Sequence, residues 1–272
     1  MSFDILAIAE VLRAAAQAEI MPRFRRLGAG DIRTKSEPSD LVTEGDEAAE
    51  RFIRRELASL VPNAQFIGEE SVAADPDLIE TVFEADLSIL VDPIDGTFNF
   101  VAGVPLFGVM ATIARRGESV GGILYDPFAD DFVLAEKGGG AFTVRPDGSR
   151  ERLRVAEPVP IDKMVGFASS GFVPAEARVK MLTNLAKVRM FASYFCAAHE
   201  YRAFAGGHAQ FVMYSKLNPW DHMAGTLIAE EAGAHVACVD GSRYDATRRD
   251  GGLLLATSAE SWETLMREIF RL

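Results

Sequence analysis

The chain alternates between helical and strand periodicities. Apolar side chains recur at helical spacing over residues 4–20, which predicts a first helix that ends before Pro22. Asp46 is predicted to open a second helix with one apolar face. Two buried strands are predicted after these helices, from short apolar runs at residues 64–67 and 87–91.

The remaining pattern predicts a layered protein of the α/β or mixed α+β class. Antiparallel strands are predicted at residues 106–115, 119–126, 131–136 and 141–145. Further strands are predicted at 164–168, 188–191, 210–213, 234–239 and 252–256, and helices at 174–186, 195–205, 220–232 and 260–270. The Pro-bearing connection 150–162 predicts a boundary inside a single domain 1–272, with subdomains 1–150 and 151–272.

Charge and cysteine content narrow the function. The 272 residues carry 28 Lys and Arg against 40 Asp and Glu, a formal net charge of -12. Such a surface repels nucleic acid and anionic lipid, so we expect neither as a partner. The two cysteines, Cys196 and Cys238, suit a reducing compartment, and the N-terminal residues do not resemble a signal peptide. We therefore expect a cytoplasmic protein.

Two carboxylates follow the strand predicted at 87–91. Pro93 has no N–H to donate and is predicted to end that strand at Asp92. Asp95 and Gly96 then form a turn in which glycine permits a tight backbone. Two such anions about 4 Å apart repel by roughly 4 kcal/mol at an effective dielectric near 20, and hard divalent cations prefer oxygen ligands. The motif favours a metal site, although a capped turn with two solvated acids is also consistent with it.

Other acids occupy comparable positions. Glu69 follows the strand predicted at 64–67, and Asp221 stands in the first turn of a predicted helix. Asp46 also lies at a helix start, where an acid serves as an ordinary cap or as a partner of the helix dipole. Spacing alone does not bring these residues together.

The motifs taken together resemble one family. Gly68-Glu69-Glu70, the run Asp92-Pro93-Ile94-Asp95-Gly96-Thr97, and Trp220-Asp221 are similar to motifs of the inositol monophosphatase family, which are Mg²⁺-dependent, lithium-sensitive phosphatases. The resemblance extends to residues 35–43 with Asp46, to 121–127 and to 224–233, and so covers nearly the whole chain. It implies an αβαβα sandwich of the inositol monophosphatase/fructose-1,6-bisphosphatase type, and a homodimer.

The resemblance also implies a ligand set for two or three Mg²⁺ ions. One ion would be held by Glu69, Asp92 and the Ile94 carbonyl, and another by Asp92, Asp95 and Asp221, with a third, weaker ion near Glu69. These ions would neutralise the acids, hold phosphate oxygens and lower the pKa of a water molecule.

The same resemblance assigns the remaining catalytic roles. Thr97, backed by Asp46, would orient or deprotonate the attacking water, with Glu69 as a further catalytic acid group. The backbone N–H groups of Gly96 and Thr97 would bind the phosphate, and Lys35 would lie on a polar loop that closes over the site.

Some positions depart from the family pattern. Phe98 stands where a second Thr is common, and Ala102 where inositol-specific members have His. Residues 194–197 (Tyr-Phe-Cys-Ala) replace a small Gly-Ser/Thr-Ala-Ala segment, and Tyr214 replaces an acid that contacts inositol hydroxyls.

A substrate pocket that contains Phe98, Tyr194 and Tyr214 leaves open which alcohol the substrate phosphate is attached to. Inositol-1-phosphate or another sugar or polyol phosphate is expected. Histidinol phosphate, a nucleotide 3′-phosphate or fructose bisphosphate is the alternative, as is a non-catalytic regulatory protein on this fold.

Overall fold

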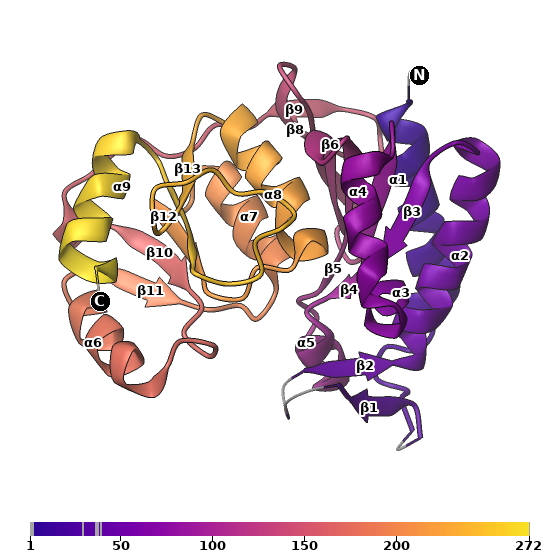
Figure 1. Cartoon of the computed structure of the whole chain (residues 1–272), viewed down its shortest axis with the longest axis horizontal. Coiled ribbons are helices and arrows are strands. Elements are labelled where there is room, and N and C mark those ends of the chain that lie inside the picture. Colours follow the sequence, from indigo (N-terminus) through magenta and orange to yellow (C-terminus); the bar gives the residue numbers. More distant parts are fainter. Residues whose placement is uncertain (1–2, 29, 36–37, 39, 272) are drawn as a thin grey trace.

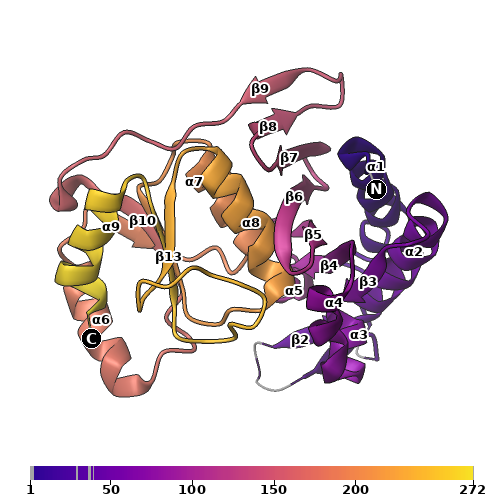
Figure 2. The same ribbon diagram turned by 45° about the horizontal axis from the view of Figure 1, so that its top comes forward.

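Five alternating layers of helices and sheets make up the molecule (Figure 1). The computed structural model describes residues 3–28, 30–35, 38 and 40–271. Helices α1 (Ile5–Ala15) and α2 (Glu44–Leu60) cover the outer face of one sheet, and α6 (Ala175–Leu185) and α9 (Ala259–Leu265) that of the other. Between the sheets lie α7 (Ala197–Ala205) and α8 (Pro219–Glu231), as Figure 2 also shows. The predicted αβαβα sandwich is confirmed.

The first sheet has seven strands, whose spatial order follows the sequence. Its first two strands are parallel and the others are antiparallel to their neighbours. They are β3 (Gln65–Gly68), β4 (Ser88–Asp95), β5 (Gly108–Arg115), β6 (Glu118–Asp126), β7 (Asp131–Glu136), β8 (Gly140–Val144) and β9 (Arg150–Arg152).

The second sheet has five strands in the order β11-β10-β12-β14-β13. They are β10 (Val165–Ala168), β11 (Met190–Ala192), β12 (Phe211–Tyr214), β13 (His235–Cys238) and β14 (Leu253–Ala256). Strand β10 is parallel to β11 and β12, whereas β14 is antiparallel to β12 and β13. The seven-stranded sheet takes its strands from residues 65–152 and the five-stranded sheet from residues 165–256, so β9 crosses the subdomain boundary that we propose after residue 150.

Side-chain alternation along the strands supplies the apolar cores between the layers. In β4, Ile89 and Val91 pack with α1 and α2, whereas Leu90 belongs to the core around α7 and α8. A third core joins the second sheet to α6 and α9. Gly122 on β6 allows close approach of α8, because a Cβ there would lie 2.7 Å from the Ala224 carbonyl oxygen. The central helices are therefore fixed against both sheets.

Several local elements were not predicted. They are the hairpin of β1 (Ile32–Thr34) and β2 (Leu41–Thr43), the helices α3 (Glu69–Ala74), α4 (Thr81–Glu84) and α5 (Thr97–Val101), and a 3₁₀ turn Pro76–Glu80. Helix α2 begins at Glu44, earlier than predicted, because Thr43 is its N-cap. Of the predicted polar loop, positions 36, 37 and 39 lie outside the described residues. The first predicted helix continues as a π-helical segment Ala16–Ile20, and the last as Met266–Phe270.

The prediction that Pro93 ends its strand was wrong, because β4 continues to Asp95. Strand β3 stops at Gly68, opposite Val91, so that Pro93 lies beyond the last β3 pairing and breaks no bond on that side.

No helix in the described ranges is long and apolar enough to cross a membrane.

Candidate active site

A bulge in β4 turns two carboxylates toward the same helix layer. Asp92 pairs with Met110 and Asp95 pairs with Gly108, so two β4 residues stand opposite one β5 residue. Without the bulge, residues three apart would point to opposite faces of the sheet. With it, both acids share the face of Leu90, toward α7 and α8. The one extra residue in the Pro93-Ile94 segment therefore brings Asp92 and Asp95 to the same face of the sheet.

Glu69 and Asp221 reach Asp92 from neighbouring elements. Because β3 and β4 are parallel and Gly68 pairs with Val91, the residues that follow these two lie at the same sheet edge. Asp221 stands in the first turn of α8, where Asn218 donates to its Oδ2 at 3.2 Å. Oxygen atoms of Glu69, Asp92 and Asp221 all lie within 4.8 Å of one another, the one such group of three acids found in the described part of the chain.

Repulsion among the carboxylates of Glu69, Asp92 and Asp221 favours a bound cation. Burial, reinforced by the charge of Glu69, raises the pKa of both Asp92 and Asp221 well above the usual range. Burial and the same charge raise the pKa of Glu70 to about 8. Buried carboxylates that repel one another match the donor set of a hard divalent ion such as Mg²⁺, which would relieve the repulsion. The residues present therefore fit the metal.

Asp95 stands beside this group but is engaged by α7. Its Oδ2 accepts from the Ala198 N–H at 2.5 Å and from the Cys196 thiol at 3.1 Å, while Oδ1 accepts from the Ala197 N–H at 3.1 Å. Burial raises the pKa of Asp95, and its charge contributes to the raised pKa values of Asp92 and Asp221. Asp95 thus links the acid group to the first turn of α7.

The Thr97 side chain lies beside Asp46, the residue with which the family resemblance paired it. The Thr97 hydroxyl donates to the Ile94 carbonyl oxygen at 2.9 Å and lies 3.2 Å from Asp46 Oδ1. The other Asp46 oxygen accepts from the backbone N–H and the hydroxyl of Thr43, at 2.8 and 2.6 Å, in a capping box. Burial raises the pKa of Asp46 to about 7, which makes this carboxylate a competent proton acceptor near neutrality.

Lys35 binds the acidic turn directly. Its Nζ donates to Glu69 Oε1 at 2.8 Å and to Glu70 Oε1 at 2.6 Å. Burial opposes the charged amine, but the two carboxylates outweigh that effect and raise the Lys35 pKa. The residue expected on a closing loop therefore contacts an expected metal ligand.

Sequence reasoning missed Glu50, which anchors that turn. Its carboxylate accepts from the Glu70 N–H at 2.7 Å and the Ser71 N–H at 3.0 Å. Gly68 leaves room for it, since a Cβ there would lie 2.2 Å from Glu50 Cδ. Glu50 stands one helical turn after Asp46 on α2, a spacing that could have revealed it.

A cavity of about 440 Å³ opens over the acids where the two halves meet. Glu69, Asp92, Ile94, Asp95, Gly96, Thr97, Phe98, Tyr214 and Asp221 are among its lining residues. Tyr194 is not, because its ring packs on Phe167, with centroids 4.5 Å apart. Glu200, Phe172 and Lys216 also line the cavity, although no sequence pattern pointed to them. Burial raises the pKa of Glu200 to about 7.

A carboxylate group that lines a cavity in this layered fold is the arrangement of a metal-dependent hydrolase. A family model described as "Inositol monophosphatase family" matches residues 3–271. The chain belongs to the inositol monophosphatase family.

Individual relatives agree with this assignment. An inositol-1-monophosphatase of Mesorhizobium japonicum is 32% identical over 214 residues, which are 76% of this chain and 75% of that protein. A fructose-1,6-bisphosphatase/inositol-1-monophosphatase of Thermotoga maritima is 29% identical over 223 residues, covering 79% and 78% of the two chains. The solved structure of a Thermotoga maritima IMPase superposes with a TM-score of 0.80 at 26% identity, over 98% of this chain and 97% of that one.

Proposed function

We propose that the chain is a Mg²⁺-dependent phosphomonoesterase that hydrolyses a small alcohol phosphate. The observation that carries the proposal is the close group of Glu69, Asp92 and Asp221 in the lining of a cavity open to a substrate. Loss of ligands would be expected in a non-catalytic regulatory relative, and the acids of the family motifs are all present here.

Asp92 would belong to the ligand sets of two Mg²⁺ ions. Glu69, Asp92 and the Ile94 carbonyl would hold one ion, and Asp92, Asp95 and Asp221 the other, with a third, weaker ion near Glu69. Asp95 retains capacity for this role, because a carboxylate oxygen has two lone pairs and Oδ1 accepts one hydrogen bond at 3.1 Å. When bound, the metal supplies positive charge for the phosphate oxygens and lowers the pKa of a water molecule.

The protein's own groups position the reactants. The Thr97 hydroxyl donates to the Ile94 carbonyl oxygen and lies 3.2 Å from Asp46 Oδ1, so its oxygen keeps a lone pair that would accept a hydrogen bond from the attacking water and aim it at phosphorus. Asp46, with its pKa near 7, would accept the proton, and Glu69 would be a second catalytic carboxylate. The Gly96 and Thr97 N–H groups would bind the phosphate, and Lys35 would close the site.

Two kinds of alcohol are candidates. Two relatives are named inositol-1-monophosphatases, which supports inositol-1-phosphate or another sugar or polyol phosphate, and the name of the second also includes fructose-1,6-bisphosphatase. The three phenylalanines that line the cavity, Phe98, Phe172 and Phe195, favour a second kind, an alcohol with a flat apolar part.

A homodimer in the cytoplasm is part of the proposal. Strand β11 forms an edge of the five-stranded sheet, and its Met190 is 58% exposed. Val179 and Leu182 of the neighbouring α6 are also exposed apolar residues. An apolar edge of this kind suits a second copy of the chain. Light scattering on the purified protein would measure twice the chain mass if the dimer forms and the single-chain mass if it does not.

Phosphate release tests the proposed chemistry. Inositol-1-phosphate, histidinol phosphate, fructose-1,6-bisphosphate and adenosine 3′,5′-bisphosphate would be offered with Mg²⁺, without it, and with added Li⁺. Mg²⁺-dependent release that Li⁺ inhibits, and that Asp92→Asn abolishes, is expected. Release that is unaffected by chelation or by Asp92→Asn would contradict the metal assignment.

A further inference from the structure

The cavity above the acids has an aromatic wall. Phe98, Phe172 and Phe195 all line it, with 43%, 43% and 64% of their surface exposed. The Phe98 and Phe195 rings pack against each other, with centroids 5.6 Å apart and planes inclined by 38°. Lys216 lies over Phe172, with Nζ 5.1 Å from the ring centroid. Large apolar side chains left open to solvent beside reactive groups mark a binding surface.

Phe195 is held in place at a conformational cost. Its φ is 51°, in the left-handed region, where a bulky residue is strained by about 1–3 kcal/mol. The other non-glycine residues with positive φ in the described part of the chain are polar, namely Arg25, Arg116 and Asp130. Such strain persists only where neighbours impose it, and it concentrates at functional sites.

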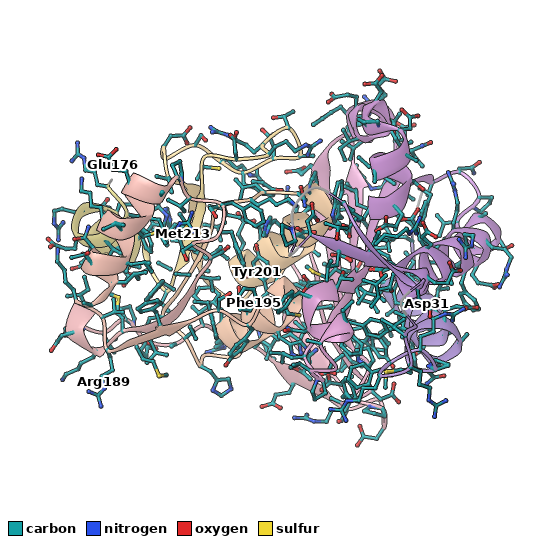
Figure 3. All side chains as sticks on the ribbon, turned by 90° about the horizontal axis from the view of Figure 1, so that it is seen from below. Asp31, Glu176, Arg189, Phe195, Tyr201 and Met213 are labelled. Atoms are coloured by element: carbon teal, nitrogen blue, oxygen red, sulfur yellow. The ribbon has the colours of Figure 1, made fainter. Side chains whose placement is uncertain are left out.

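The surroundings of Phe195 impose this conformation. The next three residues bind Asp95 through the Cys196 thiol and the Ala197 and Ala198 N–H groups. Gly96 lies so close that a Cβ there would be 3.3 Å from the Phe195 carbonyl oxygen. The exposed ring is thus attached rigidly to the acid site. Figure 3 shows Phe195 beside the central helices, between the two halves of the molecule.

Polar groups lie at the buried side of the same cavity. Glu200 is 2% exposed, and its Oε1 accepts from the Tyr194 N–H at 2.7 Å and the Ser193 hydroxyl at 3.3 Å. The buried Tyr214 hydroxyl lies beside the Glu200 carboxylate. The carboxylate of Glu200 is therefore held in position at the cavity wall by neighbouring donors.

We infer that the alcohol half of the substrate carries a flat aromatic ring with an N–H or O–H donor, stacked on Phe195 and bound by Glu200. The inference rests on the proposed phosphatase function and names its substrate class. Aromatic faces stack favourably on a planar ring, and a buried carboxylate prefers a donor. A polyol, by contrast, would place several hydroxyls against rings that cannot accept strong hydrogen bonds.

Three matched phosphates test the substrate class in the full-length protein with Mg²⁺. They are imidazolylethyl phosphate, phenylethyl phosphate and inositol-1-phosphate, compared by kcat/KM. We expect the imidazole compound first, the phenyl compound second and the polyol last. Hydrolysis in which the polyol is preferred to both rings would overturn this inference and leave the phosphatase function intact. Absence of hydrolysis of all three, with the fold intact, would overturn both.

Phe195→Gly tests the stacking residue without a folding penalty, since glycine adopts the left-handed region freely. We expect the ring-to-polyol ratio of kcat/KM to fall by about two- to tenfold, the range of one aromatic contact. Arg116→Gly is the matched control, because Arg116 has φ 48° and lies outside the cavity, in the β5–β6 turn. An unchanged ratio in Phe195→Gly, or an equal fall in both variants, would overturn the role of Phe195.

Glu200→Gln tests the donor site. Glutamine keeps an acceptor for the Tyr194 N–H but loses the charge, so the preference for imidazole over phenyl should fall about tenfold, as for loss of a charge-assisted hydrogen bond. If the imidazole-to-phenyl ratio is the same as in the wild type, Glu200 does not bind the ring.

Discussion

The Thr97 hydroxyl lies 3.2 Å from Asp46 Oδ1, although 51 positions separate the two residues in the chain. The contact joins the first turn of α2 to the residue that follows the β4 bulge. Gly45 permits it, because a Cβ at that position would lie 3.2 Å from Ile94 Cδ1. Asp46 is also fixed by Thr43, so the position of the Thr97 oxygen depends on a helix cap as well as on the acid site.

Thr97→Val removes this hydroxyl while conserving side-chain volume. If Thr97 and Asp46 orient the attacking water, kcat should fall by about 10²–10⁴-fold, the usual contribution of a positioned acid–base group. The Mg²⁺-induced rise in melting temperature should persist, because no carboxylate is lost. Thr97→Ser, which keeps the hydroxyl, is the control. Equal turnover in the Val and Ser variants would show that the hydroxyl has no catalytic part.

Asp221→Asn separates metal binding from folding. The carboxylates repel one another, so removal of one charge should raise the melting temperature of the metal-free protein, by about 2–4 °C per kcal/mol for a chain of this size. The same variant should lose most of the stabilisation that Mg²⁺ gives the wild type. Melting curves with EDTA and with Mg²⁺ would measure both effects.

Glu230→Gln is the control for that experiment, since it removes the same charge from an exposed position near the other end of α8. It should leave the Mg²⁺ response unchanged. Asp221→Asn with a full Mg²⁺ response would remove Asp221 from the ligand set.

The ends of the strands made the acid site partly predictable from sequence. Glu69 follows β3 and Asp92 lies on β4, and parallel neighbours bring such positions to one edge. The β4 bulge was not predictable, because Pro93 normally marks a strand end and only the early stop of β3 makes it acceptable. Glu50 and Glu200 were missed for another reason. Both are helical acids whose roles depend on which helix packs against which loop, and tertiary packing decides that.

Gly68→Ala tests how the acidic turn is anchored. The backbone of Gly68 is extended, with φ -99°, so alanine adds no backbone strain and only displaces the Glu50 carboxyl group. Loss of its bonds to the Glu70 and Ser71 N–H groups should cost about 0.5–2 kcal/mol, as for loss of a helix cap. Because Glu69 precedes these residues, the Mg²⁺ concentration for half-maximal activity should also rise.

A double-mutant cycle with Glu50→Ala gives the decisive comparison. If both changes act through the same contact, their unfolding free energies should be clearly less than additive. Gly30→Ala is the control, because a Cβ there meets nothing within 4 Å. If the effects of Gly68→Ala and Glu50→Ala on the unfolding free energy are fully additive, Gly68→Ala does not act through the Glu50 contact.

The buried carboxyl of Glu200 should make stability depend on pH. Its pKa rises from 4.5 to about 7 on folding, chiefly through burial, so the native state binds its proton more tightly than the unfolded state does. The contribution to stability is therefore fully present below about pH 4.5 and is lost as the pH rises through about 7. At 1.36 kcal/mol per pKa unit, a shift from 4.5 to about 7 amounts to roughly 3.4 kcal/mol.

Glu200→Gln should remove this dependence. Urea unfolding of the metal-free protein between pH 4 and 8 should show the wild type losing stability relative to the variant across that window, with a constant difference above it. Glu263→Gln changes an exposed acid on α9 and should follow the wild type at every pH. Parallel wild-type and Glu200→Gln curves over the whole range would mean that Glu200 keeps the same proton affinity in both states, and that its carboxylate remains charged at the base of the cavity.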